Sequence, residues 1–152
     1  MKSLSRIGVA LSLIAALALW TGCDSAGTGE TTVPPAVEFA SSGGSGVPVA
    51  GTVDVGVTLT DSVGASVSVE VLFATQASSA LPGEIGGFSG DPPTRSISFP
   101  DTAPAGATQS FAVDISNTDI SAGSKEALFA LQQLQSEGDV EIREPREFSL
   151  SI

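Results

Sequence analysis

The sequence predicts an all-β fold, an antiparallel β-sandwich of about seven strands preceded by a signal peptide and a flexible tether. Apolar residues alternate with polar ones in a series of short runs, as half-buried strands require. The 17 glycines and 9 prolines are spread along the chain, which indicates frequent turns rather than long helices. A length of 152 residues allows one such domain and leaves little room for a second.

The N-terminus has the order of a secretory signal peptide. Lys2 and Arg6 supply positive charge, and residues 7–19 form an unbroken apolar segment of small and aliphatic side chains. A transmembrane helix needs about 20 apolar residues, so this segment is too short to span a bilayer comfortably. We expect residues 1–22 to be removed.

The residues after the apolar segment resemble the lipobox of bacterial lipoproteins, in which the cysteine thiol receives a diacylglycerol and becomes the new N-terminus. Thr21 and Gly22 fit the two positions before Cys23, the only cysteine of the chain, and Trp20 stands where leucine is usual. The resemblance implies signal peptidase recognition through Trp20, Thr21 and Gly22 and lipidation of Cys23. An ordinary signal peptide with an incidental cysteine is the alternative. Several acyl chains on one cysteine would hold the protein at a membrane of the bacterial cell envelope, whether outer membrane, cell surface or periplasm-facing.

The segment after the cysteine predicts a tether. Residues 24–35 are rich in Gly, Ser and Thr, end in Pro-Pro, and lack apolar periodicity. With Cys23 they form a lipidated tether over residues 23–35, and the β-sandwich occupies residues 36–152.

A hairpin is the strongest structural signal of the domain. Residues 53–59 and 67–73 each alternate β-branched or large apolar side chains with mostly polar ones, and residues 61–64 predict the turn between them. Further strands are predicted by shorter alternating runs at residues 37–39, 97–99, 111–115 and 148–152. Residues 76–93 and 101–107 are predicted loops.

One segment fits two structures. Residues 124–134 are rich in helix formers, and Ala127, Leu128, Leu131 and Leu134 fall at helical spacing. Ala127, Phe129 and Leu131 also alternate with Leu128, Ala130 and Gln132, as in a strand. Local propensity favours the helix.

Composition excludes several classes of function. The chain has 17 acidic and 6 basic residues, and loss of Lys2 and Arg6 would leave 17 against 4, a formal charge near −13. Such a surface repels nucleic acid, and its simplest interpretation is solubility. The chain has no histidine and one cysteine, so the usual zinc ligand sets, Ser–His–Asp or Cys–His catalysis, and a disulfide are excluded. We expect neither enzymatic activity nor a cofactor.

Several segments together resemble the Calx-beta family, in order along the domain. They are residues 37–39, 52–60, 66–75, 96–100, 106–115, 127–132 and 144–152. The resemblance implies an immunoglobulin-like β-sandwich, as in sodium–calcium exchangers and many bacterial surface proteins. It also makes residues 127–134 a strand, against their helical propensity.

Calx-beta domains bind calcium through acidic residues in three places, and none carries over cleanly. Glu84 and Asp91 are loose substitutes in the middle loop, Asp119 is the one carboxylate in the region of the acidic cluster, and Lys125 stands where an acid would be expected. We therefore predict no metal site, with Glu84, Asp91 and Asp119 as weak candidates.

The sequence thus indicates a non-enzymatic module for interaction, adhesion or spacing, held at a membrane through the lipid on Cys23. Its partner would be an unidentified protein or glycan and not nucleic acid. One alternative is a calcium-dependent adhesion module. Another is an envelope hydrolase that uses Glu84 with Asp91, because two carboxylates alone can cleave glycosides. Those two residues share one loop that lacks the aromatic platform typical of sugar sites.

Overall fold

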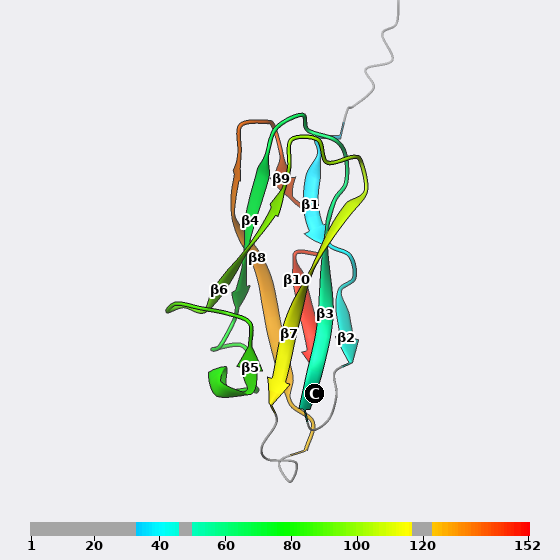
Figure 1. The fold of residues 1–152 in the computed structure, drawn as a ribbon. Coiled ribbons are helices and arrows are strands. Elements are labelled where there is room, and N and C mark those ends of the chain that lie inside the picture. Colours follow the sequence, from blue (N-terminus) through cyan, green and yellow to red (C-terminus); the bar gives the residue numbers. More distant parts are fainter. Residues whose placement is uncertain (1–32, 46–49, 117–122) are drawn as a thin grey trace, which may run out of the picture. The chain divides into compact units, whose positions relative to one another are not determined.

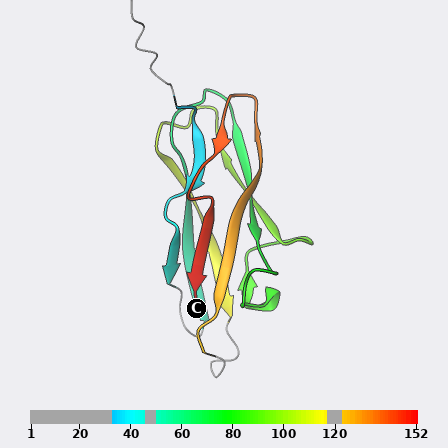
Figure 2. The same cartoon turned by 180° about the vertical axis from the view of Figure 1, so that it is seen from behind.

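Two five-stranded sheets face each other in the computed structural model, which describes residues 33–45, 50–116 and 123–152 (Figure 1). The first sheet has the order β5-β7-β3-β1-β9, with strands Ile85–Gly86, Ala107–Ser116, Ala50–Leu59, Ala36–Phe39 and Glu141–Ile142. The second has the order β2-β10-β8-β4-β6, with strands Gly43–Ser45, Glu147–Ser151, Glu126–Ser136, Val67–Phe73 and Thr94–Phe99. Figure 2 shows the second sheet from behind.

The predicted all-β sandwich is confirmed. The predicted hairpin is wrong: its two strands are present as β3 and β4, but they lie in different sheets and do not pair, so the turn between them connects the two layers. Alternation shows that each run is a strand but not which strand it pairs with. The short strands β2, β5 and β9 were not predicted, because two or three residues are too few to show an alternating pattern. The described part contains no α-helix, and its one helical turn is the 3₁₀ element η1, Pro82–Glu84.

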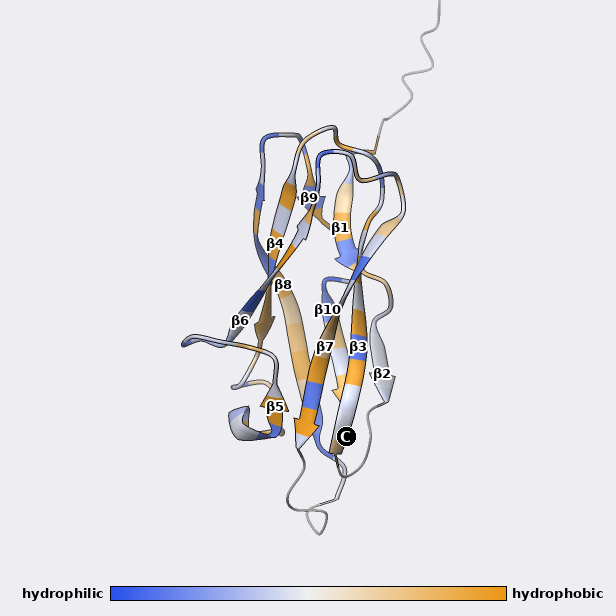
Figure 3. Cartoon of the chain, in the orientation of Figure 1, coloured by the Kyte–Doolittle hydropathy of each residue, from blue (hydrophilic) through white to orange (hydrophobic). Residues whose placement is uncertain are grey.

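The core is filled from alternate positions of the strands. β4 buries every second residue from Val67 to Phe73, and β3 buries Val55, Val57 and Leu59. Figure 3 shows the same alternation as bands of hydrophobic and hydrophilic colour along the strands. Every member of the core cluster lies between residues 37 and 152. The sandwich therefore has a hydrophobic core of its own.

The segment 124–134 contains a strand rather than the helix that propensity favours. Its residues from Glu126 onward belong to β8, which pairs antiparallel with β4 on one side and β10 on the other. Ala127, Phe129 and Leu131 are buried, whereas Leu128 and Leu134 of the helical pattern are only half-buried. Pairing on both sides satisfies the backbone along the strand, and this tertiary gain outweighs a weak local preference.

The predicted loop at residues 76–93 is folded back onto the sandwich. It contains η1 and β5, which pairs with the end of β7, and Ser89 forms a bridge with Thr94. Phe88 stacks on Phe129, with ring centroids 5.3 Å apart, and meets Phe111 edge-on at 6.0 Å. An aromatic side chain from the loop thus anchors it between the sheets.

The strand assignment of β8 makes Phe129 a core residue, because its side chain is fully buried. Phe129→Ala should lower the free energy of unfolding by about 3–5 kcal/mol, as measured by denaturant titration of residues 24–152. Gln132→Ala, on the opposite face of the same strand, is the control and should change it by less than about 0.5 kcal/mol. A clear helical signal in the far-ultraviolet circular dichroism spectrum would contradict the assignment.

Candidate functional site

A buried ion pair lies at one end of the sandwich, where the long loop meets the start of β8. Glu84 closes η1 and is 6% exposed. One of its carboxylate oxygens, Oε2, accepts the backbone N–H of Leu81 at 2.8 Å, and Oε1 forms an ion pair with the ammonium of Lys125. The backbone N–H and C=O of Lys125 both pair with Ile152, at 2.8 and 2.9 Å. The ion pair therefore ties the loop to the paired end of β8 and the C-terminus.

The positive charge next to the Glu84 carboxylate is the ammonium of Lys125. The two side chains are only 13% and 7% exposed, so their charges are largely removed from water and depend on each other. In the sequence, Lys125 stands where the Calx-beta resemblance would place an acid, and Asp119 is the nearest candidate ligand before it. The structure shows Glu84 in contact with Lys125, and Asp119 lies outside the described residues.

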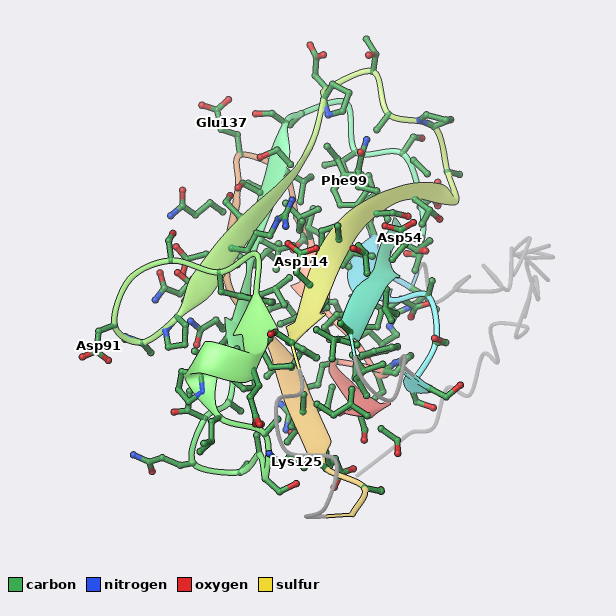
Figure 4. All side chains as sticks on the ribbon, turned by 60° about the horizontal axis from the view of Figure 1, so that its bottom comes forward. Asp54, Asp91, Phe99, Asp114, Lys125 and Glu137 are labelled. Carbon is green, nitrogen blue, oxygen red and sulfur yellow. The ribbon has the colours of Figure 1, made fainter. Side chains whose placement is uncertain are left out.

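The structure does not bring the described metal candidates together. Asp91 is exposed in the loop before β6, and Figure 4 shows it well away from Lys125, the partner of Glu84. Residues 33–45, 50–116 and 123–152 contain no group of three acidic or other metal-ligating side chains that could hold an ion. Of the two carboxylates considered for glycoside cleavage, Glu84 is engaged by Lys125 and Asp91 is exposed to solvent.

Arg95 links the two sheets where β6 lies beside β7. It lies on β6 of the second sheet, and its Nη1 donates to the carbonyl of Ala112 on β7 of the first sheet at 3.0 Å. The same nitrogen lies 3.3 Å from the carbonyl of Gly87 in the long loop, and the guanidinium stands 5.6 Å from the ring centroid of Phe111. The one base on β6 is therefore used inside the sandwich, a role that its place in the sequence did not reveal.

All four basic residues of the described chain are engaged within it. Besides Lys125 and Arg95, Arg143 pairs with Glu141 and donates to the carbonyl of Pro34, and Arg146 pairs with Glu144. The other carboxylates of the described residues form no ion pair with these bases: Glu38, Asp54, Asp61, Glu70, Asp91, Asp101, Asp114, Glu126, Glu137, Asp139 and Glu147. The surface is therefore anionic, with few cations directed to solvent.

A polar groove lies on the outer side of the second sheet, beside β6. It has a volume of about 390 Å³ and is lined by hydroxyl, amide and carboxylate side chains, among them Ser68, Ser98, Gln135 and Glu137. The register of β4 against β8 shifts between Ser68 and Glu70, which interrupts the regular ladder beside the groove. Sequence reasoning missed this groove, because the alternation of serines shows an outward face but not which strands are neighbours.

The fold resembles that of solved CBD domains of Calx proteins. A crystal structure of CBD12 from CALX1.2 matches with a TM-score of 0.61 and 18% identity, over 77% of this chain and 43% of that one. The apo form of the Calx CBD1 domain matches with a TM-score of 0.54 and 18% identity, over 76% of this chain and 96% of that one. The calcium binding domain CBD12 of CALX1.1 matches with a TM-score of 0.56 and 19% identity, over 76% of this chain and 44% of that one.

These matches show a Calx-beta-like β-sandwich and nothing finer. The chain spans less than half of the two CBD12 structures and nearly all of the CBD1 domain. No family model matches the sequence, and no curated protein matches it. Within the described residues, no helix has the length and apolar character needed to cross a membrane.

The buried ion pair predicts strong coupling between its two members. Lys125→Met would leave a buried carboxylate without its ammonium and should lower the free energy of unfolding by about 3 kcal/mol. Glu84→Gln together with Lys125→Met should recover most of that loss, because no charge is then left buried. Denaturant titration of the two single variants and the double variant measures the coupling. Additive losses would show that the two residues do not act as a pair.

Proposed function

We propose that this protein is a lipid-anchored, non-enzymatic interaction module of the bacterial cell envelope. The observation that carries the proposal is the ion pair of Glu84 with Lys125, which gives the most buried carboxylate of the described residues a structural role. The Calx-beta-like sandwich supports it, because the similar solved domains are named for binding. The sequence before the domain, with an apolar segment that ends at Cys23, supports the anchor.

The anchor would act through the lipid on Cys23, in a part of the chain outside the described residues. The domain end of the tether is held in place: Arg143 donates to the carbonyl of Pro34 at 2.9 Å, and Glu141 donates its backbone N–H to Pro35 at 3.0 Å. β1 starts directly afterwards, so a pull on the tether would be carried by backbone bonds of the first sheet. This attachment suits a domain that is held at a surface while it binds a partner.

Cys23→Ser tests the anchor. In a bacterial host the variant should lose labelling by a fatty-acid analogue and accumulate as a precursor that migrates above the mature form, because the thiol that accepts the lipid is missing. Ser25→Ala, two residues further on, is the control and should be labelled and processed as the unaltered protein is. A Cys23→Ser protein that is still cut before residue 23 and fractionates with membranes would contradict the proposal.

The same ion pair argues against a calcium-dependent adhesion module. Calcium takes about six to eight oxygen ligands, several of them anionic, and here an ammonium already lies against Glu84. The midpoint of thermal unfolding of residues 24–152 should therefore be the same in chelator and in 1 mM calcium (a concentration of the assay). A ligand at 100 times its dissociation constant would add about 2.7 kcal/mol, which is easily measured. A rise of several degrees with calcium, absent with equimolar magnesium, would make the calcium-dependent module the better proposal.

A further inference from the structure

β6 is an edge strand whose outer side is largely uncovered. Of the four strands at the ends of the two sheets, β6 has 6 residues, whereas β2 has 3 and β5 and β9 have 2 each. It pairs with β4 on one side, and Ser89 covers only its first residue, Thr94, on the other. An exposed strand edge is a template for pairing with another chain.

The register shows which backbone groups point outward. Phe73 donates its N–H to the carbonyl of Pro93 at 3.0 Å, and hydrogen-bonded pairs recur at every second residue of an antiparallel ladder. Residues 95, 97 and 99 therefore direct their N–H and C=O groups to β4, and residues 94, 96 and 98 direct theirs away. The bridge between Thr94 and Ser89 agrees with this assignment. Ser96 and Ser98 thus offer four backbone groups to an added strand, up to Pro100, which has no N–H.

Carboxylates surround this edge. Asp91 and Asp101 are exposed at its two ends, and Glu70 on β4 lies directly across from Ser96 in the register. Ser98 shares the polar groove with Glu137, and Figure 4 shows Glu137 and Asp91 on the same side of the domain. The only base of the strand, Arg95, is engaged with the carbonyls of Gly87 and Ala112. No cation of the described chain therefore neutralises the outer face of β6.

We propose that β6 binds an extended peptide segment of a partner protein, added as an antiparallel strand, with basic residues at two alternate positions. The partner residues opposite Ser96 and Ser98 would exchange backbone hydrogen bonds with them and place their side chains on the outer face of the sheet. Glu70 lies about 10 Å from such a residue, two strand spacings away, within reach of a lysine or arginine that crosses the small Ser96. The second basic residue would meet Ser98, Ser68 and Glu137 in the groove.

This inference deepens the interaction role proposed above by naming the partner's chemistry. Ser96 and Ser98 both contact the hydroxyl of Ser68, at 3.1 and 3.3 Å, so the surface between the edge and Glu70 is small and polar. Charge complementarity selects the occupant: a second copy of this acidic chain would bring further carboxylates to the same edge, whereas a basic segment would neutralise them. Binding at this edge is independent of acylation at Cys23, so each proposal can fail without the other.

The test uses the full chain in a non-ionic detergent and a fluorescein-labelled peptide, Thr-Lys-Val-Lys-Thr, read by fluorescence polarisation. The peptide should bind at least about tenfold more tightly than Thr-Glu-Val-Glu-Thr. Methylation of the backbone nitrogens of its two lysines should abolish binding, because those N–H groups face β6. Methylation of the valine nitrogen, which faces away, should leave binding unchanged. Equal binding of the two methylated peptides, or none by the unmodified peptide, would overturn the proposal.

Protein variants locate the site. Glu70→Gln with Glu137→Gln should weaken binding by roughly tenfold, whereas Asp54→Asn, an exposed carboxylate on β3 of the other sheet, should leave it unchanged. Ser96→Pro removes an outward N–H without touching the pairing with β4 and should abolish binding, while Ser96→Ala should not. If Asp54→Asn weakened binding as much as the Glu70/Glu137 changes, the peptide would be attracted by the overall negative charge of the domain. That result would overturn the assignment of the site to β6. If sedimentation showed that the unaltered protein is a dimer and that the Ser96→Pro variant is a monomer, the occupant of the edge would be a second copy of this chain and the proposal would be overturned.

Discussion

The packing of Phe129 between the two sheets is the interaction on which the rest of the structure depends. Its ring lies 5.5 Å from Phe73 on β4, 5.3 Å from Phe88 in the long loop and 6.3 Å from Phe148 on β10, measured between centroids. The chain has no tyrosine, and its one tryptophan precedes the domain, so phenylalanine supplies all the aromatic area of the core. A helix over residues 124–134 could not place one ring against both neighbouring strands and the loop, whereas a central strand does so directly.

The position of the ion pair follows from this packing. Phe88 enters the core beside Phe129 and holds the loop that carries η1, so Glu84 comes to rest where water reaches only a small part of it. A carboxylate in such a place is costly unless an opposite charge meets it. Lys125 is held two residues before the buried Ala127 by its backbone bonds to Ile152, and from there its ammonium reaches the carboxylate. Core packing, loop position and ion pair are successive consequences of one contact.

The sequence was sufficient where the information is local. Alternation predicted six of the seven main strands and the sandwich, because one buried face per strand appears directly as a period of two. It was insufficient for residues 124–134, where propensity favours a helix and the deciding interactions are pairings with β4 and β10. The same limit applies to the sites. Lys125 and Glu84 are separated by 41 positions, and no spacing rule shows that they meet. Nor could the serines of β6 show that this strand lies at an edge.

The ion pairs and hydrogen bonds of the four cations affect how the acidic surface of the domain meets other molecules. Three of them connect parts of the structure: Lys125 holds the long loop, Arg95 links the two sheets, and Arg143 holds the chain before β1. Arg146 pairs at the surface with Glu144, two positions before it. A base used in this way contributes little field to the solvent, so the exterior is more uniformly anionic than the composition alone implies. Such a field repels nucleic acid and anionic headgroups, and it accelerates the approach of basic partners. The carboxylates without an ion pair, among them those around the outer edge of β6, therefore set the charge that an approaching partner meets.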